Sequence, residues 1–78
     1  MIPVGTIVKA KAGRDKEGFF VVVKSEEKRV FIADGKRRKV ENPKMKNPVH
    51  LTVTNTVLSD SMDTNRNIRK ALRIFRED

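Results

Sequence analysis

Five consecutive apolar residues, Phe19 to Val23, constrain the fold of this chain more than any other feature. The run is aromatic and β-branched, and it follows a charged loop with a glycine at each end, so it predicts a strand. Successive side chains of a strand point to opposite faces of the sheet. Both faces of this strand therefore need cover, one from the interior of the sheet and the other from a separate element.

The C-terminal part of the sequence supplies that element. From Asn65 to Arg76 the apolar residues recur with a helical period, after Asp63 or Thr64 as the N-cap. The apolar stripe of this helix, which spans about 100° of arc, consists of Ile68, Ala71, Leu72 and Phe75. Because such a short helix is marginal alone in water, we expect it to dock over the outer face of the strand at 19–23.

Four further short strands are expected before the helix. Their predicted ranges are 6–11, 29–33, 36–40 and 49–54. Asp34-Gly35 predicts a two-residue hairpin turn, since both positions of a type I′ turn need a positive φ. In the last strand, the residues expected to face inward are Val49, Leu51 and Val53, and those expected to face outward are His50, Thr52 and Thr54.

The predicted fold is mostly β, a small, strongly bent antiparallel barrel of five strands with a C-terminal α-helix. The barrel is expected over residues 1–56, a linker over 57–62 and the amphipathic helix, packed on the barrel, over 63–76. A chain of 78 residues without cysteine has room for one domain, stabilised by packing alone.

Positive charge is concentrated in the middle of the chain. The formal net charge is +8, and residues 28–46 hold eight bases and two acids, a net +6. A concentrated run of one sign favours an anionic partner, most simply nucleic acid, over a merely solvated surface. The predicted contacts from this run are Lys36, Arg37, Arg38, Lys39, Lys44 and Lys46, and the polar face of the helix adds Arg69 and Arg73. Arg38 also fits a residue at the rim of the core that buries its alkyl stem.

Other classes of function are disfavoured by the residues that the sequence lacks. His50 is the only histidine and there is no cysteine, so we expect no metal, no cofactor and no enzyme. His50 itself is read as a surface residue or a nucleic-acid contact. Peptide and methyl-lysine sites use Trp and Tyr, and the chain has neither. No apolar run approaches the ~20 residues of a membrane span, so we expect a soluble protein. We also expect it to be cytoplasmic and monomeric.

Two parts of the sequence resemble a known family. Val4–Lys16 followed by Phe19–Val23 looks like a KOW motif, the first hairpin of an SH3-like barrel in ribosomal proteins and transcription elongation factors. Three later segments make the match more specific: Ala33–Val40, Pro43–Asn47 and His50–Leu51. Together they resemble the small bacterial KOW proteins that are similar to a large-subunit ribosomal protein of archaea and eukaryotes. The resemblance covers about residues 3–52 and departs from the family pattern at Glu17, where a glycine is usual.

The resemblance implies RNA binding, with ribosomal RNA as the usual partner. The loop of the KOW hairpin typically contacts RNA or neighbouring proteins. The resemblance therefore implies that Arg14 and Lys16 contact RNA, and it implies the same for the segment from Lys36 to Lys46. The favoured hypothesis is a non-catalytic RNA-binding module. The alternatives are an adaptor that binds an acidic ribosomal or transcription protein, and a DNA-binding protein.

Overall fold

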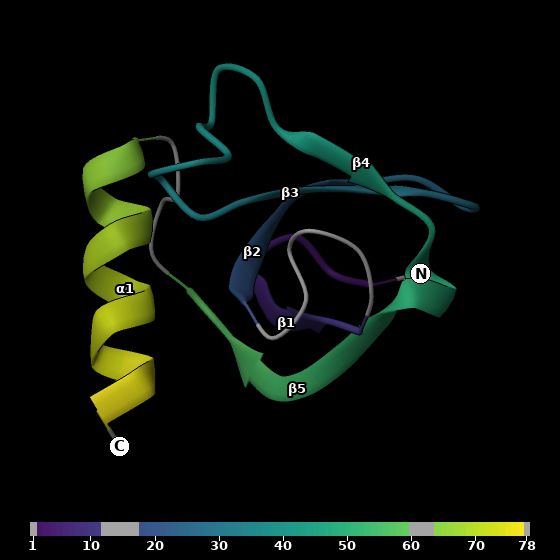
Figure 1. Cartoon of the computed structure of the whole chain (residues 1–78). Helices are drawn as coiled ribbons and strands as arrows, with labels where there is room; N and C mark the ends of the chain where they lie inside the picture. The colour runs from purple at the N-terminus through teal and green to yellow at the C-terminus, as the bar shows by residue number, and fades with distance from the viewer. Residues whose placement is uncertain (1, 12–17, 60–63, 78) are drawn as a thin grey trace.

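The chain forms a bent antiparallel sheet with one helix on its outside (Figure 1). The computed structural model describes residues 2–11, 18–59 and 64–77. Its elements are β1 (Thr6–Ala10), β2 (Phe19–Ser25), β3 (Val30–Ala33), β4 (Lys44–Lys46), the 3₁₀ turn η1 (Pro48–His50), β5 (Leu51–Val57) and α1 (Asn65–Glu77). The strand order is β4-β3-β2-β1-β5. Since β4 and β5 are the edges, the sheet is barrel-like but not closed, and the expected mostly-β fold with a C-terminal helix is confirmed.

The alternating residues of β2 divide between two cores. Phe20 and Val22 face the inside of the curved sheet, where the other buried side chains are Val8, Ala10, Val30, Ile32 and Leu51. Val21 faces the outside and lies in register with Ile7 of β1 and Ala33 of β3. This cross-strand row is the surface on which Ile68 and Leu72 of α1 pack, and both side chains are buried. Both faces of β2 are therefore covered, as its sequence requires.

The beginning and the end of α1 are each fixed by a specific contact. Thr64 is the N-cap, because its Oγ1 accepts a hydrogen bond from the Asn67 N–H at 3.2 Å. Towards the C-terminus, Phe75 meets Phe19 of β2 edge to face, with 5.2 Å between the ring centroids. The helix thus docks along the outer face of β2, which is the position that its apolar stripe predicts.

The prediction of a strand at 36–40 is wrong, and so is the two-residue hairpin turn before it. The Asp34 carboxylate accepts hydrogen bonds from the backbone N–H groups of Lys36, at 2.8 Å, and Arg38, at 2.9 Å. The Arg38 carbonyl in turn accepts from Asp34 N at 2.9 Å and Gly35 N at 3.1 Å. These local bonds compete with strand pairing, which is why an aspartate here builds a loop. The fourth strand forms later, as β4, which pairs with β3.

The prediction for the start of the last strand also needs correction. Pro48 begins a 3₁₀ turn, and the Asn47 side chain caps it by accepting from the Val49 N–H at 3.0 Å. Val49 is therefore 66% exposed rather than inward, and His50 ends the turn instead of lying in a strand. Leu51 is buried as expected, whereas Val53, opposite Val8 in the edge strand β5, is 48% exposed.

Candidate nucleic-acid interface

Three hydrogen bonds tie the loop after β3 to the first half of α1. The Val40 N–H donates to Asn65 Oδ1 at 2.7 Å, and Asn65 Nδ2 donates to Glu41 Oε1 at 2.8 Å. Nη1 of Arg69 donates to the Gly35 carbonyl at 2.8 Å. We call these three bonds the loop–helix latch. The latch holds the basic loop beside the cationic helix, although the bonded residues are 24 to 34 positions apart in the chain.

Gly35 allows the loop and the helix to come this close. Its φ is +80°, a conformation that residues with a side chain rarely adopt. A Cβ at this position would also collide with the Asn65 carbonyl oxygen and would lie 2.8 Å from Cγ of Arg69. The glycine is thus required both by its own backbone and by the approach of α1.

Asn65→Ala is expected to lower the free energy of unfolding by about 1.5 kcal/mol, because it leaves the Val40 N–H without its acceptor. Asn65→Asp is the matched variant. It keeps an acceptor for Val40 but places a second carboxylate beside Glu41 in place of the amide donor. Chemical denaturation followed by circular dichroism should show a smaller loss for the aspartate. Equal losses would mean that the bond to Val40 contributes little.

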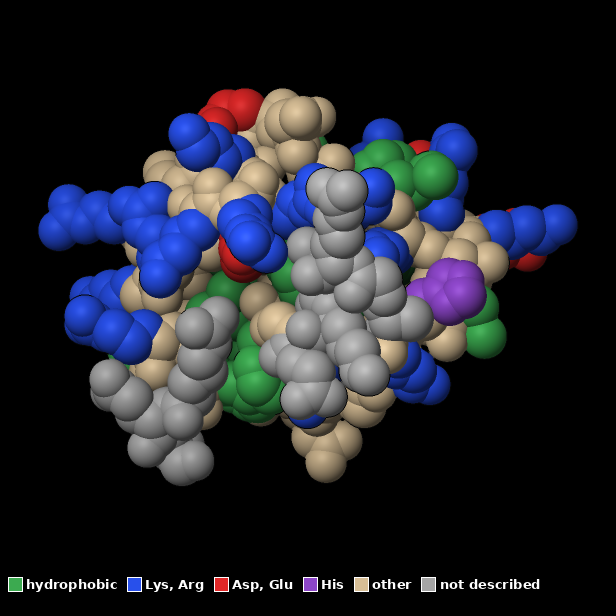
Figure 2. Space-filling view, in the orientation of Figure 1, with side chains coloured by type: hydrophobic (Ala, Val, Ile, Leu, Met, Phe, Trp, Pro, Cys, Tyr) green, Lys and Arg blue, Asp and Glu red, His purple; other side chains and the backbone are tan. Residues whose placement is uncertain are grey.

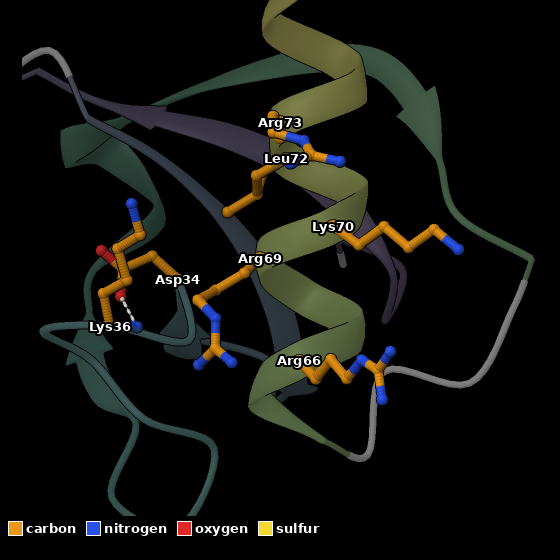
Figure 3. Close-up of a pocket in the computed structure, with 7 residues that line it drawn as sticks. All are labelled: Asp34, Lys36, Arg66, Arg69, Lys70, Leu72 and Arg73. Carbon is orange, nitrogen blue, oxygen red and sulfur yellow. Dashed lines mark hydrogen bonds between the residues drawn. The ribbon is translucent and has the colours of Figure 1, made fainter.

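A hollow of about 700 Å³ lies between this loop and α1 (Figure 3). Five cationic side chains line it: Lys36, Arg66, Arg69, Lys70 and Arg73. Asp34 and Leu72 complete the lining. In Figure 3, Arg69 extends from the helix toward the loop that carries Asp34 and Lys36, whereas Arg66 and Lys70 extend the other way. The cationic side chains that line the hollow are therefore fanned out along both sides of the helix.

The described carboxylates near this hollow are occupied by other bonds. Asp34 accepts from two backbone N–H groups, and Glu41 accepts from Asn65. The ion pairs between described residues join Glu26 to Lys24 and Arg29, in the hairpin between β2 and β3. There the hydrogen bond from Arg29 holds the pKa of Glu26 below its ordinary value. The hollow thus keeps most of its positive charge.

The structure brings together only part of the predicted site. Lys36, Arg69 and Arg73 line the hollow. Arg37 and Lys39 lie in the same loop and are exposed, and Arg38 is half-buried there.

The remaining predicted residues lie elsewhere. Lys44 and Lys46 belong to β4 and His50 to η1, which Figure 1 places away from α1. Arg14 and Lys16 fall outside the described residues. In Figure 2, blue side chains lie on the side that carries α1, on the opposite side and between the two.

Arg66 and Lys70 line the hollow but were not among the predicted contacts. Their spacing could have identified them, because residues three and four apart on a helix are neighbours. Positions 66, 69, 70 and 73 therefore form one stripe. The role of Asn65 had no comparable signal, since a lone asparagine at a helix start reads as a capping residue.

Comparison with protein-family models and with curated proteins finds no match for this chain. Within residues 2–11, 18–59 and 64–77, no cluster of histidine and carboxylate side chains has the size of a metal site. The same part of the chain has no helix that is long and apolar enough to cross a membrane. The functional argument therefore depends on the fold and on the arrangement of charge.

Proposed function

We propose that the protein is a non-catalytic RNA-binding module of the KOW type, a cytoplasmic monomer that contacts structured RNA, most simply ribosomal RNA. One observation carries the proposal: the loop–helix latch sets the cations of the loop and of α1 on one side, where the described carboxylates are engaged in other bonds. Forked arginine donors and flexible lysines suit the phosphate oxygens of a nucleic-acid backbone. The resemblance to KOW proteins supports RNA as the nucleic acid.

The contact is expected to use two surfaces. The first, here called the α1 surface, comprises the loop at 36–39 and the cationic stripe of α1. The second is β4, where Lys44 is exposed and Lys46 is half-buried. The body of the sheet separates the α1 surface from β4. An RNA that contacts both surfaces must therefore curve around the protein, as a folded RNA with a concave surface can.

Charge reversal on each surface in turn should show how much that surface contributes to RNA affinity. Arg37→Glu is expected to weaken the binding of a structured RNA at least about tenfold at 0.15 M salt, because it removes a phosphate contact and adds repulsion. Lys44→Glu should have a similar or smaller effect. Lys28→Glu, an exposed residue in the turn between β2 and β3, makes the same change in net charge and serves as the control.

Affinity would be measured by fluorescence anisotropy of labelled RNA over a series of salt concentrations. The affinity of Arg37→Glu should fall well below that of Lys28→Glu, and the salt dependence should be shallower than for the wild type. Identical affinities for the two variants would contradict the proposal. Equal affinity of the wild-type protein for duplex DNA of the same length would assign the surface to DNA instead.

A second candidate function is an adaptor that binds an acidic ribosomal or transcription protein. A surface near β4 favours it: the charged groups of Lys24 and Arg29 lie 5.4 and 5.9 Å from the ring centroid of Phe31. Met45, opposite Phe31 in β4, is 50% exposed. Aromatic residues, methionine and arginine are enriched at protein interfaces. Capture of one acidic protein that survives nuclease treatment would support this function over RNA binding.

A further inference from the structure

We infer that the hollow between the loop and α1 anchors two or more adjacent phosphate groups of an RNA backbone. The inference rests on the proposed function and goes further, because it assigns the phosphate contact to one built site. This site is the hollow of about 700 Å³ that the loop and α1 enclose on two sides.

The charge of the hollow calls for more than one phosphate. Five cationic side chains and a single carboxylate line it, a net +4, and that carboxylate is engaged by the backbone of the loop. One phosphodiester carries one negative charge, so a single group would leave most of the cations uncompensated. A chain of phosphates compensates them in turn, as polyanions do when they displace counterions.

The positions of the cations along α1 lead to the same conclusion. Arg66 and Arg73 are seven residues apart, which is about 10.5 Å along the helix axis. Figure 3 shows the side chains fanned to both sides of the helix rather than converging on one point. A single phosphate at hydrogen-bond distance from Lys36 and Arg69 is therefore poorly placed for Arg66 and Lys70. An extended chain of phosphates can contact both groups.

Arg69 gives the hollow a fixed donor. One N–H of its Nη1 is held by the Gly35 carbonyl, which orients the planar guanidinium, and the other N–H groups remain for a ligand. Leu72 lies in the same lining and is buried, whereas the Arg69 side chain is exposed. A guanidinium that is already oriented can make charge-assisted hydrogen bonds to phosphate oxygens with less further ordering of its side chain.

Inorganic tripolyphosphate is a suitable probe, because it presents three linked phosphate groups without bases or ribose. Titration of the full-length protein, followed by backbone amide resonances, should shift Lys36, Arg69 and Arg73 in a saturable way. Tripolyphosphate should bind at least about tenfold more tightly than orthophosphate at the same ionic strength. Equal affinity for the two probes, or shifts confined to β4, would overturn the inference.

The double variant Lys36→Gln/Arg73→Gln tests the site, with Lys11→Gln/Lys28→Gln, two exposed lysines outside both proposed surfaces, as the matched control of equal charge. Arg69 is left intact because it belongs to the latch. The double variant should lose about tenfold or more in affinity for both tripolyphosphate and RNA, and the control should keep its tripolyphosphate affinity. If the double variant binds RNA like the wild type, the inference fails and the proposed function stands. If wild-type protein binds no RNA, the proposed function fails and the inference fails with it.

Discussion

Ile68→Ala is expected to lower the free energy of unfolding by about 3 kcal/mol, the usual cost of emptying a fully buried aliphatic site. Ile68 is 0% exposed and packs with Val21 and Ala33 beneath α1. A chain of 78 residues typically has a total stability of about 4 to 12 kcal/mol, so the loss is a large share of it. The melting temperature, followed by circular dichroism at 222 nm, should fall by roughly 15 °C.

Ile74→Ala is the matched control, since it makes the same substitution in the same helix at a side chain that is 52% exposed. Its cost should stay within about 0.5 kcal/mol. Helix propensity changes equally in both variants, so their difference reports packing alone. Equal melting temperatures for the two variants would mean that α1 does not dock on β2 in solution.

Gly35→Ala is expected to cost about 2–4 kcal/mol. A left-handed conformation costs an alanine about 1–2 kcal/mol, and the added Cβ also meets the Asn65 carbonyl oxygen and Cγ of Arg69. Either α1 shifts or the loop reorganises, and in both cases the latch is broken. Thermal unfolding should show a melting temperature lower by roughly 10–20 °C.

Lys36→Ala, at the next position, provides the control for Gly35→Ala. The backbone N–H of Lys36 donates the hydrogen bond to Asp34, so truncation of the Lys36 side chain leaves that bond in place. Its melting temperature should stay close to that of the wild type. A Gly35→Ala protein as stable as Lys36→Ala would show that the loop accommodates the Cβ, and that the close approach of α1 is not required.

The features of the fold that could be predicted from the sequence are those with a strong periodicity. The strand at Phe19–Val23 is apolar on both faces, so a second element had to pack on its outer face. The apolar stripe that contains Ile68 and Leu72 was the only helical pattern in the sequence that could do so. The two patterns were complementary, which is why both the helix and its docking surface were found. The mostly-β class followed from the short strands that precede them.

The prediction failed where local polar bonds override periodicity. Apolar and polar residues alternate poorly from Lys36 to Val40, because most of these residues are charged. The prediction of a strand there therefore depended on the hairpin turn predicted at Asp34-Gly35. The Asp34 side chain instead bonds the backbone of its own loop. Pro48 has a similar effect after β4, since its fixed φ starts a 3₁₀ turn. Such bonds depend on side-chain geometry that residue identity alone does not specify.

The charges of the candidate site were evident in the sequence, but their proximity was not. The segment 28–46 and α1 were each recognised as cationic. Nothing in the order of residues indicated that Asn65 would bond Val40 or that Arg69 would bond Gly35. The same lack of long-range information is why the sequence did not indicate how Lys44, Lys46 and His50 lie relative to α1, from which the sheet separates them.

The row formed by Ile7, Val21 and Ala33 has a consequence for the order in which the chain assembles. Three different strands contribute to the row, so the landing surface for α1 exists only after β1, β2 and β3 have paired. A 13-residue helix has little stability before it docks. Docking of α1 therefore completes folding rather than nucleating it. The latch closes in that same final step, so a nascent or partly unfolded chain carries the same charges without the surface that arranges them.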